Sequence, residues 1–424
     1  MAEPAADLAA HVAQTLHATM QMDLVARRQA EQHLLALSGQ PGYATSLTRL
    51  TLEASAPLEL RQLAAVLLKQ FVRAHWCTAP AVADAEKAAV RELLPRGLSD
   101  AVPRIRTAVS MAIASIAQYD WPDEWPGLMG ELLAPLQAAA GAAGAAGAAG
   151  AAGAADAADA GVSGVLRCLE LCAAELHAEH LPEACSSLLP LLLSLAGSPA
   201  GHARRDRARA VHVGCRLLER LADLHADNLP MLRSLGNGPL TDWTTVALVE
   251  LGREPDGSSD GSGSGDCSLE IALLRLLRLL VSSFPRALSP HADKLLPTLG
   301  AQLSRASRGL EAQAHAADAA TCGPGGSTLY DSDGAPLGVE AVVTQLLDVL
   351  AGLAASSKLY KLLTPSLREV FTAALGLCAV PPATQAAWEA DVSQYLQDED
   401  DDSYAVSSRV AAQQLILEVH GGHF

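Results

Sequence analysis

Aromatic residues are scarce in this chain of 424 residues, since Phe, Trp and Tyr together make up 4 % of the sequence. Hydrophobic residues nevertheless account for 50 %, which is enough to bury a large core. That core must be built mainly from Ala, Leu and Val. Ala and Leu head the ranking of helix propensity, whereas β-sheets favour aromatic and β-branched residues. The composition therefore predicts an all-α protein.

Long apolar runs are also missing. The longest, Leu188–Ala196, has about nine residues, whereas a membrane-spanning helix needs ~20. The N-terminal segment MAEPAADLAAHVAQ contains early acidic residues and no apolar centre, so a secretory signal is not expected. The 8 cysteines lack the spacing of a disulfide framework. These features predict a reducing, intracellular compartment and no membrane insertion.

Positive charge is in short supply, because 30 Lys and Arg face 47 Asp and Glu, for a net charge of −17. An acidic protein of this size is repelled by nucleic acid and by anionic membrane surfaces. The charge balance therefore argues against direct binding of nucleic acid and favours basic protein partners.

Motifs for catalysis and for metal binding are missing as well. The sequence has no GxxxxGK[ST] and no HExxH motif. The stretch Leu329–Glu340 imitates a calcium loop, but Leu occupies its first ligand position and Pro336 stiffens it. Cys168 and Cys172 lie near two histidines, without the CxxC pair typical of zinc sites. We therefore expect no enzymatic activity, no catalytic residue, no cofactor and no metal.

Helical periodicity is the main feature that the sequence does contain. From about residue 5 to residue 135, stretches of about 12–20 residues with Leu, Val and Ala at helical spacing alternate with short breaks. Helix starts recur in pairs every ~40 residues, the period of HEAT and armadillo repeats. The predicted fold is a right-handed α-helical solenoid of about eight repeats, in which each repeat packs only on its neighbours.

Three stretches interrupt this periodicity. Ala138–Gly161 consists of Ala-Ala-Gly triplets, in which each Gly costs a helix ~1 kcal/mol. Asp256–Asp266 is rich in Gly, Ser and Asp, and Ala314–Gly334 is a looser insertion. All three are interpreted as flexible insertions.

One predicted helix, over 61–76, carries a polar face opposite Leu67 and Phe71. The residues of that face are Arg61, Gln62, Lys69, Gln70 and Arg73. The sequence leaves two interpretations open. The face is either the solvated side of an ordinary amphipathic helix or a surface that offers cations to an acidic partner.

A second predicted helix, over 204–221, carries a narrower cationic stripe. Its members align within about one-sixth of a turn, and they are Arg205, Arg209, His212, Arg216 and Arg220. Val211, Cys215 and Leu218 fall on the opposite side. Aligned cations repel one another unless a carboxylate answers them. That carboxylate is either intramolecular, from Glu219 or a facing helix, or belongs to a partner.

Acidic residues form a run at 397–402, preceded by Glu389 and Asp391. The carboxylates of the run are Asp398, Glu399, Asp400, Asp401 and Asp402. Their mutual repulsion favours an extended, solvated loop. This loop either keeps the protein soluble or binds a basic ligand on the inner side of the solenoid.

Several of these segments resemble the importin-β family of nuclear transport receptors. The chain has an R-x-A-E helix at Arg28–Glu31, followed by an R-x-x-A-x-x-x-L-K helix that starts at Arg61 and ends in Trp76. The segment YDWPDEWP at Tyr119–Pro126 is similar to a Trp-Pro turn between early repeats of these receptors. Tyr330–Gly338 and 398–415 extend the resemblance toward the other end of the sequence.

The resemblance implies a HEAT-repeat receptor that carries basic cargo, histone-like or ribosomal-protein-like, into the nucleus. It also implies binding of the Ran GTPase in its GTP form, contact with Phe-Gly-repeat nucleoporins, and a monomer that shuttles between cytoplasm and nucleus. The acidic loop at 398–402 matches a family loop that binds cargo or Ran. The candidate Ran- or partner-binding residues are those that match the inner helices of the family: Arg27, Arg28, Glu31, Arg61, Gln62, Lys69, Gln70, Arg205, Arg209, Arg216 and Arg220.

The resemblance also predicts the domain organisation. In chain order we expect an importin-β N-terminal domain with the first HEAT repeats (1–137), the Ala/Gly insertion (138–161), HEAT repeats (162–255), a Gly/Ser/Asp linker (256–266), a HEAT repeat (267–313), a loop insertion (314–334), and HEAT repeats with the acidic loop (335–424). The family is typically about twice this length, so a truncated or partial receptor is expected. The alternatives are a HEAT scaffold or regulatory subunit outside transport, and an export receptor of the same superfamily.

Overall fold

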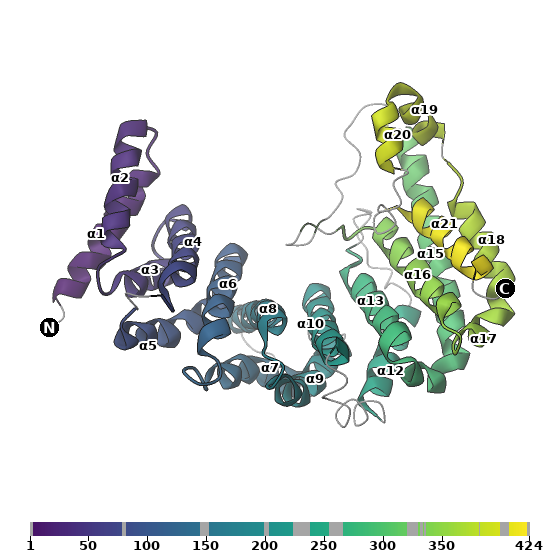
Figure 1. Cartoon of the computed structure of the whole chain (residues 1–424), viewed down its shortest axis with the longest axis horizontal. Coiled ribbons are helices and arrows are strands. Elements are labelled where there is room, and N and C mark those ends of the chain that lie inside the picture. Colours follow the sequence, from purple (N-terminus) through teal and green to yellow (C-terminus); the bar gives the residue numbers. More distant parts are fainter. Residues whose placement is uncertain are drawn as a thin grey trace. The chain divides into compact units, whose positions relative to one another are not determined.

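The computed structural model describes residues 3–78, 82–144, 152–198, 203–223, 238–253, 266–319, 330, 334, 336–380, 382–398 and 407–421. Within these ranges the regular structure is helical, apart from an isolated β-bridge between Tyr330 and Pro336 (Figure 1). The all-α prediction is therefore confirmed. The helices divide into two compact units, the first made of Met1–Ala184 and Ala200–Asp206 and the second of Cys185–Pro199 and Arg207–Phe424.

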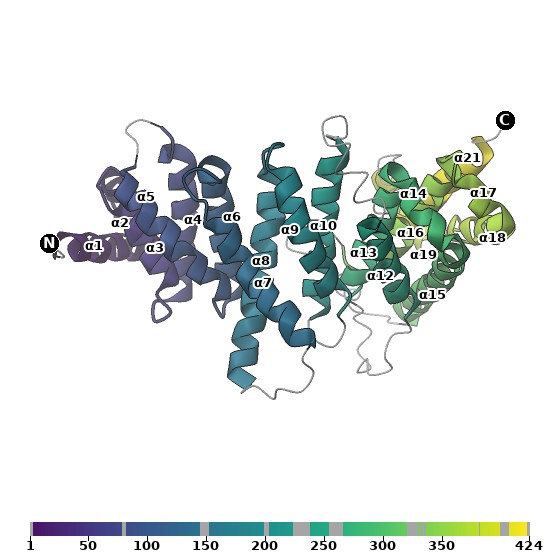
Figure 2. The same ribbon diagram turned by 90° about the horizontal axis from the view of Figure 1, so that it is seen from below.

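The first unit consists of two rows of helices. Its elements are α1 (Glu3–Thr19), α2 (Leu24–Leu37), α3 (Tyr43–Leu52), α4 (Leu58–His75), α5 (Asp84–Leu93), the 3-10 helix η1 (Leu94–Ser99), α6 (Pro103–Asp120), α7 (Leu128–Gly144) and α8 (Ala152–Glu175). Helices α4, α6 and α8 pack on one another in sequence, and α1, α3 and α5 form the other row (Figure 2). This side-by-side stacking of neighbours is the arrangement expected of a helical repeat protein.

The second unit repeats this arrangement. It contains most of α9 (Leu181–Ala196) and α10 (Arg204–Asp223), followed by α12 (Pro239–Gly252), α13 (Ser268–Ser283), α14 (Pro285–Leu288), η2 (Ser289–His291), α15 (Ala292–Ala319), α16 (Val339–Ala355), α17 (Tyr360–Leu363), η3 (Thr364–Ser366), α18 (Leu367–Leu377), α19 (Pro382–Ala390), α20 (Val392–Asp398) and α21 (Ser408–Gly421). Helices α13, α16 and α21 pack in one row, and α12, α15 and α18 pack in the other.

The ends of the helices are set by local chemistry. Asp23 accepts a hydrogen bond from the Val25 amide at 2.9 Å and so caps α2, as short polar residues do at helix starts. Gly42 precedes α3 with φ +92°, a conformation that favours glycine. The Gly42 amide donates to the Glu86 carboxylate of α5 at 2.7 Å. The carboxylate of one repeat therefore stabilises the helix N-terminus of the repeat before it.

A glycine also explains how α8 packs closely on η1 within the first unit. A side chain built on Gly164 would lie 2.0 Å from the Leu98 carbonyl oxygen, which is too close for any other residue without a shift of the backbone. Leu98 belongs to η1, and both α6 and η1 contact α8. The loss of helix propensity at Gly164 is therefore offset by a closer packing of backbone on backbone.

The interpretation of the interruptions as flexible insertions is partly wrong. Helix α7 extends into the Ala-Gly segment as far as Gly144, and α8 begins inside it at Ala152. Alanine supplies two of every three residues there, and its high helix propensity compensates for the glycines at both ends. Helix α15 likewise extends to Ala319, beyond the predicted start of the third insertion. Residues 256–265 and most of 320–335 lie outside the described residues.

No single helix in the described ranges is long and apolar enough to cross a membrane. Among the residues that the structure describes, one pair of helical segments, α16 and Tyr360–Leu377, is long and apolar enough when the two are taken together, but the pair is bent by 117°.

Candidate partner-binding surfaces

Helix α2 presents the first group of predicted site residues on its exposed side. Ala30, Leu34 and Leu37 are its buried residues, and Arg27, Arg28 and Glu31 lie in solvent. Arg27 Nε lies 3.8 Å from Glu31 Oε1, one helical turn away. An exposed pair of this kind contributes little to stability, ~0.5 kcal/mol. These three side chains are therefore accessible to a partner.

Helix α4 corrects the sequence analysis at one position. Arg61 was grouped with the polar face, but it is 4 % exposed. Its Nε donates to the Thr51 carbonyl oxygen at 3.0 Å, and its guanidinium forms an ion pair with Asp100. Arg61 therefore joins the end of α3 to the segment before α6, and the prediction that it offers its charge to a partner is wrong.

The remaining residues of the α4 group keep part of their surface. Gln70 is exposed, and Gln62 and Lys69 are partly exposed. Lys69 Nζ lies 3.7 Å from Met111 Sδ of α6, so the lysine stem leans against its neighbour. Arg73, one turn further along the same face, is exposed, so the accessible chemistry of α4 is two cations and two amides.

The Trp-Pro segment and the tryptophan that ends α4 meet in a buried polar cluster. Trp76 Nε1 donates to Asp120 Oδ1 at 2.9 Å, and Arg91 donates to Asp120 Oδ2 at 3.1 Å. Arg91 also donates to the Glu124 carbonyl oxygen at 2.6 Å. Trp76 is fully buried and Asp120 is 4 % exposed. The two sequence signatures therefore have a structural role, because each satisfies the buried polar groups of the other.

Helix α10 shows the two sides that its sequence predicts. Val211, Cys215 and Leu218 are buried. The stripe residues Arg205 and Arg216 are exposed, and Arg209, His212 and Arg220 are partly exposed. Arg216 Nε donates to His212 Nε2 at 3.3 Å, and the other stripe residues also interact within the chain. The cationic side chains therefore interact with groups inside the protein, while part of each side chain stays exposed to solvent.

Arg207, on the opposite side of α10, was not identified from the sequence. It is 6 % exposed, and its Nε and Nη2 donate to the Ala196 carbonyl oxygen at 2.9 and 2.8 Å. Its guanidinium also pairs with Glu250 of α12 at 2.5 Å, and Glu250 in turn pairs with Arg253 at 2.9 Å. Arg207 is thus the counterpart of Arg61 in the second unit.

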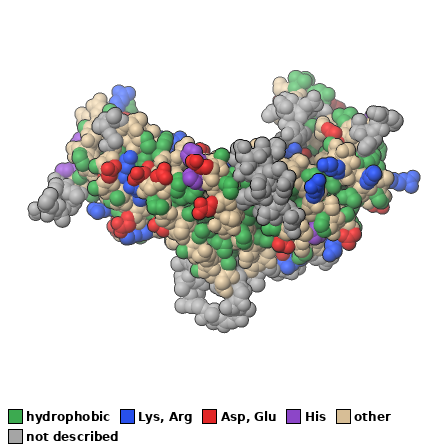
Figure 3. Space-filling model, turned by 60° about the horizontal axis from the view of Figure 1, so that its bottom comes forward, with side chains coloured by type: hydrophobic (Ala, Val, Ile, Leu, Met, Phe, Trp, Pro, Cys, Tyr) green, Lys and Arg blue, Asp and Glu red, His purple; other side chains and the backbone are tan. Residues whose placement is uncertain are grey.

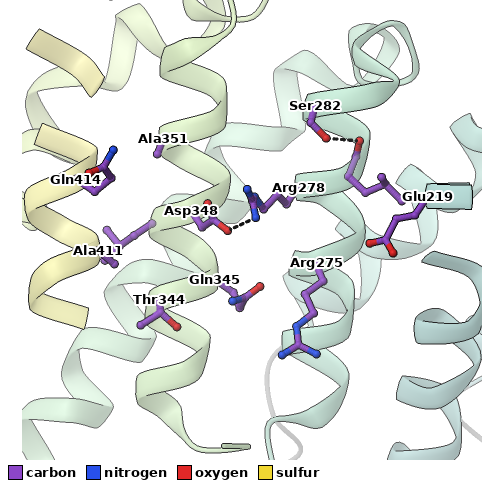
Figure 4. Close-up of a pocket in the computed structure, with 12 residues that line it drawn as sticks. Glu219, Arg275, Arg278, Ser282, Thr344, Gln345, Asp348, Ala351, Ala411 and Gln414 are labelled. Carbon is purple, nitrogen blue, oxygen red and sulfur yellow. Dashed lines mark hydrogen bonds and ion pairs between the residues drawn. The ribbon is translucent and has the colours of Figure 1, made fainter. Parts of the chain in front are cut away.

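The second unit also contains a polar cavity of about 450 Å³ that the sequence did not reveal. Residues of α10, α13, α16 and α21 line it (Figure 4). Arg278 of α13 and Asp348 of α16 form an ion pair of 2.8 Å within it. Burial raises the pKa of Asp348, and the positive charge of Arg278 opposes that rise. Arg275 of α13 makes no hydrogen bond or ion pair with the residues drawn (Figure 4).

The acidic run is largely outside the described residues. Asp398 is the last residue of α20, and Glu399–Asp402 are not described. The preceding helix carries Trp388, whose ring packs edge-on against Tyr395 at 5.2 Å and lies under the guanidinium of Arg409 at 5.0 Å. These contacts connect the α19–α20 pair to α21.

Four cysteines in the described part of the chain are buried, namely Cys168, Cys172, Cys185 and Cys215, whereas Cys77 is exposed. Cys168 Sγ and Cys172 Sγ are 3.9 Å apart and buried, and the hydrogen bond between them and their burial raise the pKa of Cys168. Thiols in this state are poor metal ligands, because a ligand must be the thiolate. Among the residues that the structure describes, no group of at least three His, Cys, Asp or Glu side chains is placed to hold a metal ion.

Charges of both signs lie over the face of the molecule that Figure 3 shows, interspersed with hydrophobic and neutral side chains. The net charge of −17 is therefore not concentrated on that face. On this face, a partner would therefore meet local groups of side chains rather than one field of a single sign (Figure 3).

Residues 30–100 match the sequence profile of the Importin-beta N-terminal domain. Importin-9 of Drosophila melanogaster is 19 % identical over 403 residues, which are 93 % of this chain and 36 % of that protein. The chain thus spans about a third of the length of this curated relative.

Two solved structures of similar proteins share the fold. The exportin Cse1 in its cargo-free, cytoplasmic state has a TM-score of 0.61 and 13 % identity, and the likeness covers 99 % of this chain and 42 % of Cse1. Kap95 in its complex with Nup1 has a TM-score of 0.59 and 16 % identity, covering 97 % of this chain and 42 % of Kap95. The predicted HEAT-repeat solenoid fold is confirmed by these likenesses.

Proposed function

This chain belongs to the importin-β family of nuclear transport receptors, and we propose that it forms part of a receptor that carries protein cargo into the nucleus. The family consists of transport receptors and not of enzymes, in agreement with the missing catalytic motifs. The observation that carries the proposal is the N-terminal domain match at residues 30–100, within helices that share the fold of Cse1 over nearly the whole chain.

The proposed site for Ran in its GTP form lies on α2 and α4 of the first unit. Exposed Arg27, Arg28 and Glu31 on α2, together with Lys69 and Gln70 on α4, supply charged and hydrogen-bonding groups to a protein partner. Gln62 adds a partly exposed amide. Arg61 is excluded from the site, because its guanidinium is engaged with Thr51 and Asp100.

The proposed cargo is a basic protein of the histone-like or ribosomal-protein-like kind. The net charge of −17 favours such cargo, and the acidic residues 398–402 are proposed to contribute to its binding. The stripe Arg205, Arg209, Arg216 and Arg220 is proposed as a separate partner surface. Contact with Phe-Gly-repeat nucleoporins is also proposed, supported by the fold shared with Kap95, which was solved with Nup1. We also propose that the protein shuttles between cytoplasm and nucleus as a monomer.

The fold shared with Cse1 favours an export receptor as the second candidate. Import and export differ in the sign of one coupling free energy, since Ran-GTP lowers cargo affinity in import and raises it in export. A HEAT scaffold outside transport is distinguished more simply, because it would not discriminate between the two nucleotide states of Ran.

The decisive experiment measures binding of the purified chain to Ran loaded with GTP and with GDP, near physiological salt. We expect a preference for the GTP form of about tenfold or more. Arg28→Glu and Lys69→Glu should each weaken the GTP-dependent binding by about threefold or more, since each reverses one accessible charge. Arg368→Glu, which changes an exposed arginine of the second unit, is the matched control.

Equal affinity for both nucleotide forms would contradict the proposal. A second arm adds a lysine-rich peptide as the cargo probe. Its release by Ran-GTP indicates import, and its tighter binding in the presence of Ran-GTP would replace the import proposal by the export candidate.

A further inference from the structure

Three cavities of the second unit share lining residues and form one continuous groove, named here the α10–α21 groove. The first, of about 250 Å³, lies between α10 and α13. The second, of about 450 Å³, reaches from these helices to α16 and α21, and the third, of about 800 Å³, continues along α13, α16 and α21. Glu219 and Arg275 line the first two cavities, and Arg278 and Asp348 line the last two.

The floor of the groove is made of small residues. Ala272, Ala351, Gly352, Ala355 and Ala411 all line it. A polypeptide backbone can approach such a floor closely, because no long side chain stands in its path. Larger apolar side chains also line the groove, namely Leu279 and Leu347 in the middle cavity and Val281 in the third. An extended ligand is inferred from the small residues, which let a backbone approach, together with the amides of the walls.

The walls supply groups that can bind an extended backbone and acidic side chains. Gln345 and Gln414 line the middle cavity from two different helices, and each carries both a donor and an acceptor (Figure 4). Amides spaced along a groove can pair with successive peptide groups of a bound strand.

The charges of the walls give the groove its selectivity. In the first two cavities the cations are Arg216, Arg275 and Arg278, and the carboxylates are Glu219 and Asp348. Asp348 is already paired with Arg278 at 2.8 Å. Arg275 makes no hydrogen bond or ion pair with the residues drawn with it (Figure 4), and the three arginines of these two cavities outnumber the two carboxylates. This end of the groove is therefore cationic in a protein whose net charge is −17.

We propose that the α10–α21 groove binds an extended, carboxylate-bearing segment of a partner protein, with Arg275 and Arg216 as the residues that select its acidic side chains. The inference rests on the proposed function, in which the stripe on α10 is a partner surface, and it names the chemistry of the partner that this stripe binds. The proposed partner segment is acidic, whereas the negative net charge of the chain suggests basic partners. Basic cargo segments bind elsewhere on the chain, and the α10 end of the groove disfavours them by repulsion from its arginines.

The test uses the whole chain and a fluorescein-labelled poly-Glu peptide of about ten residues, followed by fluorescence anisotropy, with a poly-Gln peptide of equal length as the neutral probe. We expect poly-Glu to bind and poly-Gln to bind at least about tenfold more weakly, with affinity falling as salt rises. Arg275→Glu should weaken poly-Glu binding by about tenfold, and the milder Arg275→Gln by about threefold. Arg286→Glu, an exposed arginine of the same unit outside the groove, should change it by less than about twofold.

Equal losses for Arg275→Glu and Arg286→Glu would overturn the proposal, because they would indicate a diffuse charge effect. So would a wild-type chain that does not bind poly-Glu, or one that binds an oligouridine more tightly and loses it through the same substitution. Thermal unfolding of each variant shows that it is folded, and Arg275→Gln keeps the test valid if charge reversal disturbs the fold. Binding of Ran-GTP to the same samples separates the two proposals, since it involves α2 and α4 only. If the wild-type chain binds poly-Glu but does not bind Ran-GTP, the proposed function is refuted and the proposal for the groove is retained.

Discussion

Helix α4 of the first unit and helix α10 of the second unit each place one arginine inward near the N-terminal end. Arg61 joins the Thr51 carbonyl of α3 to Asp100, and Arg207 joins the Ala196 carbonyl of α9 to Glu250. Both arginines are nearly fully buried. The same arrangement thus appears in both units, with an arginine that connects the end of the preceding helix to a carboxylate further along the chain.

The outward faces of the two helices differ. Helix α4 presents Lys69 and Arg73 together with two amides, whereas α10 presents a line of arginines and a histidine. The inward residues are alike because they solve the same problem of packing one repeat on the next. The outward residues do not have that packing role, so they are where we expect the two units to differ in the partners they bind. The predictions below separate these two roles.

The largest expected effect is the loss of the inward arginine of α10. Arg207→Ala leaves Glu250 buried with only Arg253 to pair it and leaves the Ala196 carbonyl without its donor. Removing one partner of a buried ion pair typically costs ~3–5 kcal/mol, and we expect about 3 kcal/mol here because Arg253 remains. Urea unfolding measures the loss, and hydrogen exchange of α9 and α12 locates it. Arg209→Ala, two residues away on the outward side, should cost less than about 1 kcal/mol. Similar losses for both variants would show that the inward position is not special.

The next effect separates stability from recognition within α4. Arg61→Met keeps the aliphatic bulk but removes the bonds to Thr51 and Asp100, so we expect a loss of ~2–3 kcal/mol in unfolding free energy. The folded fraction should still bind Ran-GTP as the wild type does. Lys69→Glu should show the reverse, with stability within about 0.5 kcal/mol of the wild type and weaker Ran-GTP binding. A binding defect in Arg61→Met at temperatures where it is fully folded would return Arg61 to the binding site.

The all-α fold and the stripe on α10 were predictable, because both depend on helical periodicity alone. The inward position of Arg61 was predictable in principle. Residues at i+3, i+4, i+7 and i+11 from it are Ala64, Ala65, Leu68 and Val72, all buried. Arg207 begins the same pattern, with Ala210, Val211, Gly214 and Leu218 behind it. An arginine at the head of an apolar stripe indicates an inward side chain, and charge alone conceals it.

The groove and the polar cluster at Trp76 were not predictable from the sequence. Trp76 and Asp120 are 44 residues apart, and their hydrogen bond depends on how α4 and the end of α6 are brought together. The groove requires the spacing of several helices whose lining residues are individually unremarkable alanines, glutamines and arginines. Helical periodicity determines which residues share a face of one helix, but not which faces of different helices enclose a cavity.

The smallest expected effect concerns Asp348, whose carboxylate forms the ion pair with Arg278 inside the groove. Burial raises the pKa of Asp348 above its usual value of 3.8, so the folded protein binds the Asp348 proton more tightly than the unfolded chain does. This tighter binding stabilises the fold fully below pH 3.8, and the stabilisation is lost as pH rises through the raised pKa. Asp348→Asn cannot ionise at this position and so does not suffer this loss. The unfolding free energy of the variant relative to the wild type should therefore rise between about pH 4 and pH 7. The rise should be less than ~1 kcal/mol, because the pair of Asp348 and Arg278 is partly solvated. Urea midpoints at the two pH values measure it.

The same substitution frees Arg278, which should tighten poly-Glu binding by about twofold. A variant that instead becomes less stable on going to pH 7 would show that attraction to Arg278 outweighs burial, and that the groove in its unliganded state is held together by that pair.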